Sequence, residues 1–119
     1  MPFEPRAIRG DEAEVIRTAL ARPPLMEVLP QVLERLAGAT VNGVCGCGCA
    51  SIHLELGTAD CKPIADAVGT TVRGHRVGVL VWGRRDTIVS LEIYDLEDDT
   101  DVSLPTPASI QPFASKAGE

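Results

Sequence analysis

The sequence predicts an α+β fold: two N-terminal helices packed on one face of an antiparallel sheet of three to five strands, then a Pro-rich C-terminal tail. Two observations favour it. Apolar residues recur at helical spacing before residue 38, and apolar and polar residues alternate along several stretches of 44–94. Since 119 residues fit one domain, we expect a single domain spanning 1–119.

The first third of the chain has a helical pattern. Residues 1–10 contain two prolines and a glycine and are expected to form an extended lead-in, whereas residues 11–38 are expected to be helical. The first helix should end at Pro23, because a proline pushes the residue before it out of the helical region. A second apolar stripe contains Pro30, which suits a first helical position, so we expect a helix from about Pro30 to Gly38.

Residues 44–94 are expected to form the antiparallel sheet. Residues 51–56 alternate between polar and apolar side chains and predict a half-buried strand. A polar loop is expected over 57–66, followed by a short strand over 70–73. Two further alternating stretches flank Gly83-Arg84-Arg85-Asp86 and predict a β-hairpin. Trp82 and Tyr94 lie near the expected strand ends, as interface anchors or as residues at the edge of the core.

Residues 95–119 are expected to be an acidic run followed by the Pro-rich tail. The acidic run includes Asp98, Asp99 and Asp101, which are interpreted either as a solvated surface or as a site that binds a basic protein. Leu104, Ile110 and Phe113 are expected to attach parts of the tail to the domain.

Charge and hydropathy limit the partners and the compartment. The net charge of -6 argues against a nucleic-acid partner, which would need a basic surface. No apolar run approaches the roughly 20 residues that cross a bilayer, so no membrane partner is expected. The N-terminus does not resemble a signal peptide, so we expect a cytoplasmic protein whose cysteines stay reduced.

The cysteines are the main candidates for a chemical site. We consider Cys45, Cys47, Cys49 and Cys61 as zinc ligands, with His53 as an alternate ligand. In a continuous strand the outer two cysteines of the first three would lie about 13 Å apart, too far for one ion. A zinc site therefore requires the glycines between them to fold the chain back. The alternatives are closely packed small residues, a disulfide or a reactive thiol.

No nucleotide-binding loop, serine-hydrolase elbow or zinc-protease helix occurs in the sequence, so we assign no catalytic and no cofactor-binding residues. We expect a non-enzymatic, regulatory or immunity-like protein that binds another protein with a basic surface. The alternative is a zinc-binding or thiol-based module centred on the cysteines, and the third possibility is a small cysteine-dependent enzyme.

The sequence also resembles a family of small bacterial proteins with a Cys-x-Cys-Gly-Cys-x-Ser core and a Leu-Glu-x-Tyr strand. Here the core is Cys45-Gly46-Cys47-Gly48-Cys49-Ala50-Ser51, and the strand is Leu91-Glu92-Ile93-Tyr94. The resemblance runs from about Glu12 to Pro107. It implies an α+β fold but no activity and no catalytic residues, since none is assigned to the family.

Overall fold

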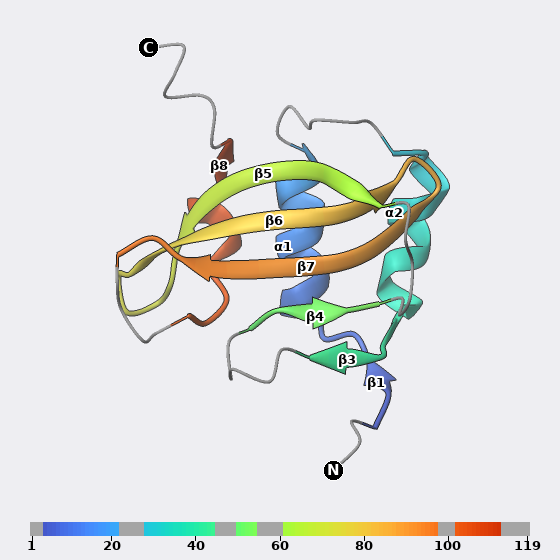
Figure 1. Ribbon diagram of the computed structural model, residues 1–119, viewed down its shortest axis with the longest axis horizontal. Helices are drawn as coiled ribbons and strands as arrows, with labels where there is room; N and C mark the ends of the chain where they lie inside the picture. Colours follow the sequence, from blue (N-terminus) through green and yellow to red (C-terminus); the bar gives the residue numbers. More distant parts are fainter. Residues whose placement is uncertain (1–3, 22–27, 45–49, 55–60, 98–101, 113–119) are drawn as a thin grey trace.

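Three nine-residue antiparallel strands form the centre of the fold in a computed structural model that describes residues 4–21, 28–44, 50–54, 61–97 and 102–112 (Figure 1). They are β5 (Lys62–Thr70), β6 (Arg76–Arg84) and β7 (Thr87–Asp95). Three two-residue strands complete a six-stranded sheet in the order β3-β4-β7-β6-β5-β8. These short strands are β3 (Gly43–Val44), β4 (Ile52–His53) and β8 (Gln111–Pro112).

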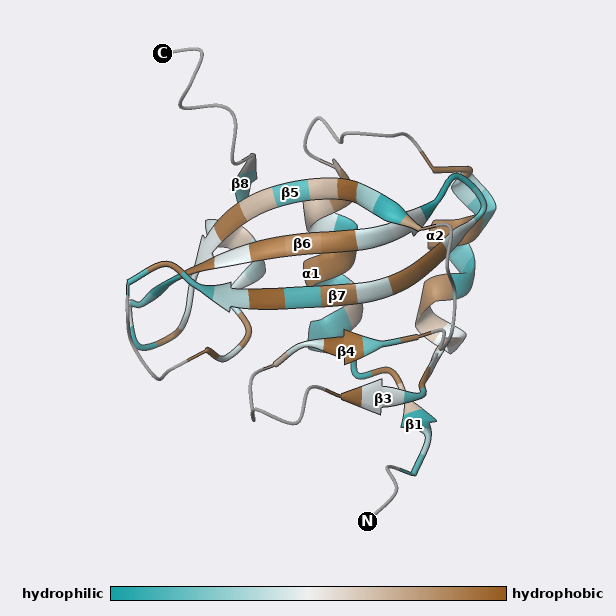
Figure 2. Ribbon diagram, in the orientation of Figure 1, coloured by the Kyte–Doolittle hydropathy of each residue, from teal (hydrophilic) through white to brown (hydrophobic). Residues whose placement is uncertain are grey.

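The predicted hairpin is confirmed as β6 and β7. Its strands are rich in β-branched residues, and the chain reverses at Arg85–Asp86. The register pairs Val77 with Asp95 at one end and Arg84 with Thr87 at the other, with a shift beside Trp82. The hydropathy colours show alternation along β5 and β7, the two strands that flank β6 (Figure 2).

The prediction for the segment before this hairpin is wrong. Of the expected loop over 57–66, residues 57–60 lie outside the described residues, and the chain is already strand from Lys62. The expected strand over 70–73 holds only at Thr70, the last residue of β5, and at Thr71, which forms an isolated bridge; a turn follows, and Gly74 after it has a φ of 88°. Pro63 and Asp66 suggested a loop, while the core-facing residues of β5 other than Ile64 are alanines and a glycine, which give a weak apolar signal. Pairing with β6 along the length of β5 overrides these local preferences.

The α+β prediction of two N-terminal helices packed on the sheet is also wrong, because the structure is mainly β. Only α1 (Gly10–Ala21) lies across the face of the long strands, behind them in Figure 1. The second helix, α2 (Pro30–Arg35), has six residues and continues into a 3-10 turn, η1 (Leu36–Gly38). It begins at Pro30 as expected but is too short to cover the sheet, and it lies beside the end of β6 and β7 (Figure 1).

The expected lead-in and tail both contribute to the fold. In the lead-in, β1 (Arg6–Ala7) pairs with β2 (Thr40–Val41) as a separate two-stranded sheet. In the tail, a second 3-10 turn, η2 (Pro107–Ser109), precedes β8, and Ile110 is fully buried, as predicted. Phe113 lies outside the described residues.

The hydrophobic core fills the space between α1 and the sheet. The largest completely buried side chains are aliphatic and come from both layers, including Ile16, Ile64, Leu91 and Ile93. Burial of such side chains is the main stabilising term in a domain of this size.

An ion pair between the half-buried Arg6 and the buried Glu12 connects the N-terminal strand to α1. The carboxylate of Glu12 is 2% exposed and accepts hydrogen bonds from both terminal nitrogens of Arg6, at 3.0 and 2.7 Å. It also accepts the backbone N–H of Arg9 at 2.9 Å. Burial alone would raise the pKa of Glu12, but these hydrogen bonds and the two arginine charges outweigh it and lower the pKa.

Candidate functional site

The two faces of the long strands have different surroundings. Alternation turns Val77, Val79 and Val81 of β6 toward α1. The opposite face is not overlaid by any helix or strand of the described chain (Figure 1). We call it the open face, and its residues are Asp66, Val68, Leu80, Trp82, Glu92 and Tyr94.

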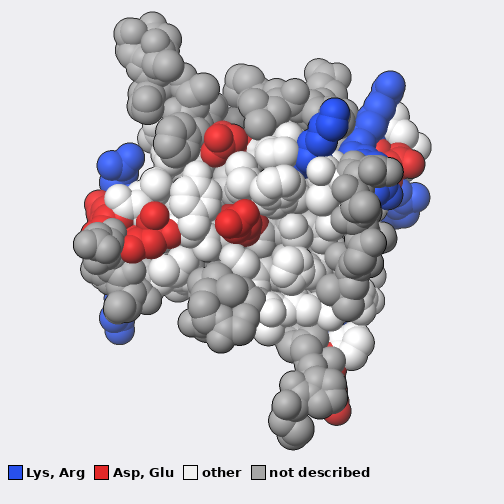
Figure 3. Space-filling view, in the orientation of Figure 1, with Lys and Arg blue, Asp and Glu red and all other residues white. Residues whose placement is uncertain are grey.

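The strand register sets the order of side chains across the open face. Asp66, Leu80 and Glu92 form one row, since Leu80 is paired with both acids. The Cα atoms of the two acids are therefore separated by two strand spacings, about 10 Å. Figure 3 shows isolated acidic side chains on a largely uncharged surface over the long strands.

A neighbouring row places Tyr94 over a glycine. Gly78 is paired with both Val68 and Tyr94. A Cβ atom added to Gly78 would overlap the ring of Tyr94, so the phenol ring rests directly on the backbone of β6. The absence of a side chain at Gly78 lets the ring lie flat across the sheet.

Glu92 is held in place by Trp82. The indole Nε1–H of Trp82 donates a hydrogen bond of 3.0 Å to Oε1 of Glu92. Trp82 lies diagonally from Glu92, because its direct partner on β7 is Ser90. Diagonal neighbours on one face are within reach of long side chains, and this bond fixes both groups on the open face.

Asp66 has an unsatisfied carboxylate oxygen. Its Oδ1 atom is buried and has no hydrogen-bond partner among the described residues. Burial raises the pKa of Asp66 above its usual range. The pKa of Tyr94 is raised by burial first and then by the negative charges of Asp66 and Glu92.

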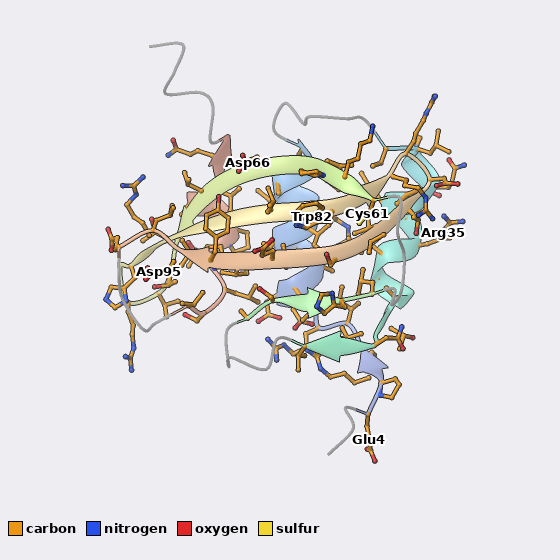
Figure 4. The ribbon with its side chains drawn as sticks, in the orientation of Figure 1. Glu4, Arg35, Cys61, Asp66, Trp82 and Asp95 are labelled. Atoms are coloured by element: carbon orange, nitrogen blue, oxygen red, sulfur yellow. The ribbon has the colours of Figure 1, made fainter. Side chains whose placement is uncertain are left out.

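These features together favour binding of a cation with an apolar stem. A positive group can pair with Asp66 or Glu92 and lie against the faces of Trp82 and Tyr94. Its stem can cover the exposed parts of Leu80 and Val68. Figure 4 shows Asp66 and Trp82 on neighbouring strands of this face.

The structure does not test most of the predicted zinc ligands. Cys45, Cys47 and Cys49 lie outside the described residues. Cys61 is a half-buried free thiol immediately before β5, and His53 is exposed on β4. Within the described residues, no group of three or more histidine, cysteine or acidic side chains is placed to hold a metal ion. The zinc and thiol hypotheses therefore stay predictions.

The acidic residues predicted to bind a partner, Asp98, Asp99 and Asp101, also lie outside the described residues. The acids that the structure brings to the open face, Asp66 and Glu92, were not predicted as site residues. Glu92 lay within a recognised strand, and alternation from Leu91 would have placed it opposite the core. Asp66 had no such signal, because its segment was predicted to be a loop.

No helix in the described part of the chain is both long enough and apolar enough to cross a membrane. Comparison with known proteins adds no family: no protein-family model, curated protein or solved structure matches the chain. The resemblance to small bacterial proteins with a Cys-x-Cys-Gly-Cys-x-Ser core stays a prediction.

Proposed function

We propose that this chain is a non-enzymatic domain that binds another protein, and that the open face receives a lysine or arginine side chain of that partner. The single observation that carries the proposal is the buried Oδ1 of Asp66, which has no donor among the described residues. A buried carboxylate oxygen without a donor destabilises the free protein. A cationic group of a partner that pairs with the accessible part of this carboxylate would stabilise the charge that burial disfavours.

The surroundings of Asp66 fit an arginine or lysine better than a small inorganic cation. Trp82 and Tyr94 offer aromatic faces, and Leu80 lies between the two acids. A guanidinium or ammonium group gains from an aromatic face as well as from a carboxylate. The net charge of -6 would also attract a basic partner from a distance.

The test is a pair of short peptides that differ only in charge. The probe is Leu-Arg-Leu-Arg with blocked ends, and its control carries citrulline, a neutral group of nearly the same shape, in place of arginine. We expect saturable binding of the arginine peptide, followed by the fluorescence of Trp82, the one tryptophan of the chain. Backbone amide shifts should map to β5, β6 and β7.

Two variants that each remove one negative charge distinguish binding at Asp66 from attraction by the net charge of the chain. Asp66→Asn should weaken the arginine peptide about tenfold, the size expected for losing one charge-assisted hydrogen bond. Glu14→Gln removes an exposed charge from α1, on the other side of the sheet, and should change affinity by less than about twofold. Equal binding of both peptides, or equal effects of both variants, would contradict the proposal.

A further inference from the structure

The turn between β5 and β6 presents an apolar side chain and a cation to solvent. It lies at the end of the long strands opposite α2 (Figure 1). Val72 is 84% exposed, the most of any large apolar side chain among the described residues. Arg73 beside it is also exposed. We call Val72-Arg73-Gly74 the tip.

Hydrogen bonds within the turn hold the tip in place. The N–H of Gly74 donates to the carbonyl of Thr71 at 2.9 Å, and the N–H of Thr71 donates to the carbonyl of His75 at 2.8 Å. Thr71 is 3% exposed, and its hydroxyl accepts the N–H of His75 at 3.2 Å. The tip is therefore formed before it meets a partner, which lowers the cost of binding.

The tip carries a cation that is available for a partner. Arg73 has no ion pair within the described chain. The nearby carboxylate of Glu97 accepts the backbone N–H of Arg76 at 3.2 Å. An exposed cation next to an exposed apolar side chain is the kind of group that the open face favours, since that face has two acids, two aromatic rings and Leu80. The tip and the open face are complementary in charge and in polarity.

The tip does not reach the open face of its own molecule. Asp66 lies four residues before Thr70, the last residue of β5, which places it about 13 Å back along the strand. The tip continues the chain beyond Thr70, and the hydrogen bonds of the turn keep it there. A cation from the tip can therefore meet an open face only in another molecule.

We infer that the tip of one copy of this chain binds the open face of a second copy. Arg73 pairs with Asp66 or Glu92. Val72 packs against Leu80, which lies between the two acids. The inference rests on the function proposed for the open face and names its partner. Two different surfaces meet, so the contact is heterologous.

The contact should be weak. One turn covers little surface, and the net charge of -6 on each copy opposes association. We expect a dissociation constant of about 0.3 mM, which is typical of transient contacts.

Self-association of the wild type is the first test. Sedimentation equilibrium should show association at about 1 mM, and dilution should shift the amides of the tip and of β5, β6 and β7. The arginine peptide should compete and return the chain to a monomer. A wild type that stays monomeric at about 1 mM would overturn the inference. The proposed function fails separately, if the arginine peptide does not bind to the monomer.

Matched variants locate the two surfaces. Arg73→Glu and Asp66→Asn should each weaken self-association at least about tenfold. Arg85→Glu, which makes the same change of charge in the exposed part of the β6–β7 turn, should stay within about twofold of the wild type, as should Glu14→Gln. Thermal melts confirm that each variant is folded.

A mixture of the two weakened variants is the decisive measurement. The Arg73→Glu copy keeps an intact open face, and the Asp66→Asn copy keeps an intact tip. Together they should form one-to-one pairs with an affinity within about fivefold of the wild type, because one native contact is restored. A mixture that associates no better than either variant alone, or self-association that survives both changes, would overturn the inference.

Discussion

The two faces of the long strands share one backbone but carry different kinds of side chains. The face under α1 is aliphatic, and its central valines and leucine are completely buried. The open face carries the only tryptophan and the only tyrosine of the chain, together with two carboxylates. Because alternate residues of a strand point to opposite faces, one face is shaped by packing while its neighbour is free to carry polar and aromatic groups.

The largest expected difference between the two faces is in the stability lost when one leucine on each is truncated. Leu91→Ala on the covered face should cost about 3 kcal/mol in the free energy of unfolding, since it leaves a cavity beneath α1. Leu80→Ala on the open face should cost about 1 kcal/mol, because its side chain is only half-buried. Urea unfolding followed by circular dichroism measures both. Similar costs for the two variants would show that the open face is also packed.

A second comparison concerns Glu12 and Asp66, whose pKa values are shifted in opposite directions. Glu12, on the side of α1, has its hydrogen bonds satisfied, so Glu12→Gln should cost about 2 kcal/mol by weakening a buried ion pair. Asp66→Asn should be neutral or stabilising, because it removes a charge whose buried oxygen has no donor among the described residues. Chemical unfolding at neutral pH measures both changes. A loss of stability in Asp66→Asn similar to that in Glu12→Gln would contradict this assignment.

The same pair predicts opposite dependences on pH. The folded pKa of Glu12 lies below its unfolded value of about 4.3, so its contribution is present above that pH and is lost as the pH falls through the lowered pKa. The folded pKa of Asp66 lies above its unfolded value of about 3.9, so stability rises as the pH falls from the raised pKa toward about 3.9. Unfolding curves of the wild type and of each variant should be measured across this acid range. Glu12→Gln should lack the acid-induced loss of stability that Glu12 causes, and Asp66→Asn should lack the gain in stability that protonation of Asp66 causes.

The smallest effect is spectroscopic and concerns Tyr94 alone. Its pKa lies above the usual value of about 10 because of burial and then the charges of Asp66 and Glu92. Asp66→Asn combined with Glu92→Gln should lower this pKa, and burial should still hold it above that of free tyrosine. Near-ultraviolet absorbance of the phenolate measures it, with Glu14→Gln as the control. An unchanged titration would place the acids too far from the ring to matter.

The elements that could be predicted from the sequence are those with a strong local pattern. Helix α1 and the β6–β7 hairpin have strong periodicity, and α2 begins at Pro30 because proline suits the first helical turn. Strand β5 could not be predicted, because Pro63 and Asp66 suit a loop and only the partner strand fixes them in the sheet. The open face was missed for the same reason, since only the register of three strands places Asp66 on the same face as Glu92 and Tyr94.

The outermost strands of the main sheet are short. Both β3 and β8 have two residues, and β8 ends in Pro112, which has no N–H to offer a further strand. Pro105 forms an isolated bridge to Thr71, next to the same edge. A long bare edge would serve as a template on which copies of the chain could polymerise, and short strands with prolines are the usual protection against it. In the described part of the chain, these edges offer few backbone groups for pairing between copies, so a partner is expected to contact the face of the sheet that carries Trp82 and Tyr94 and not its edges.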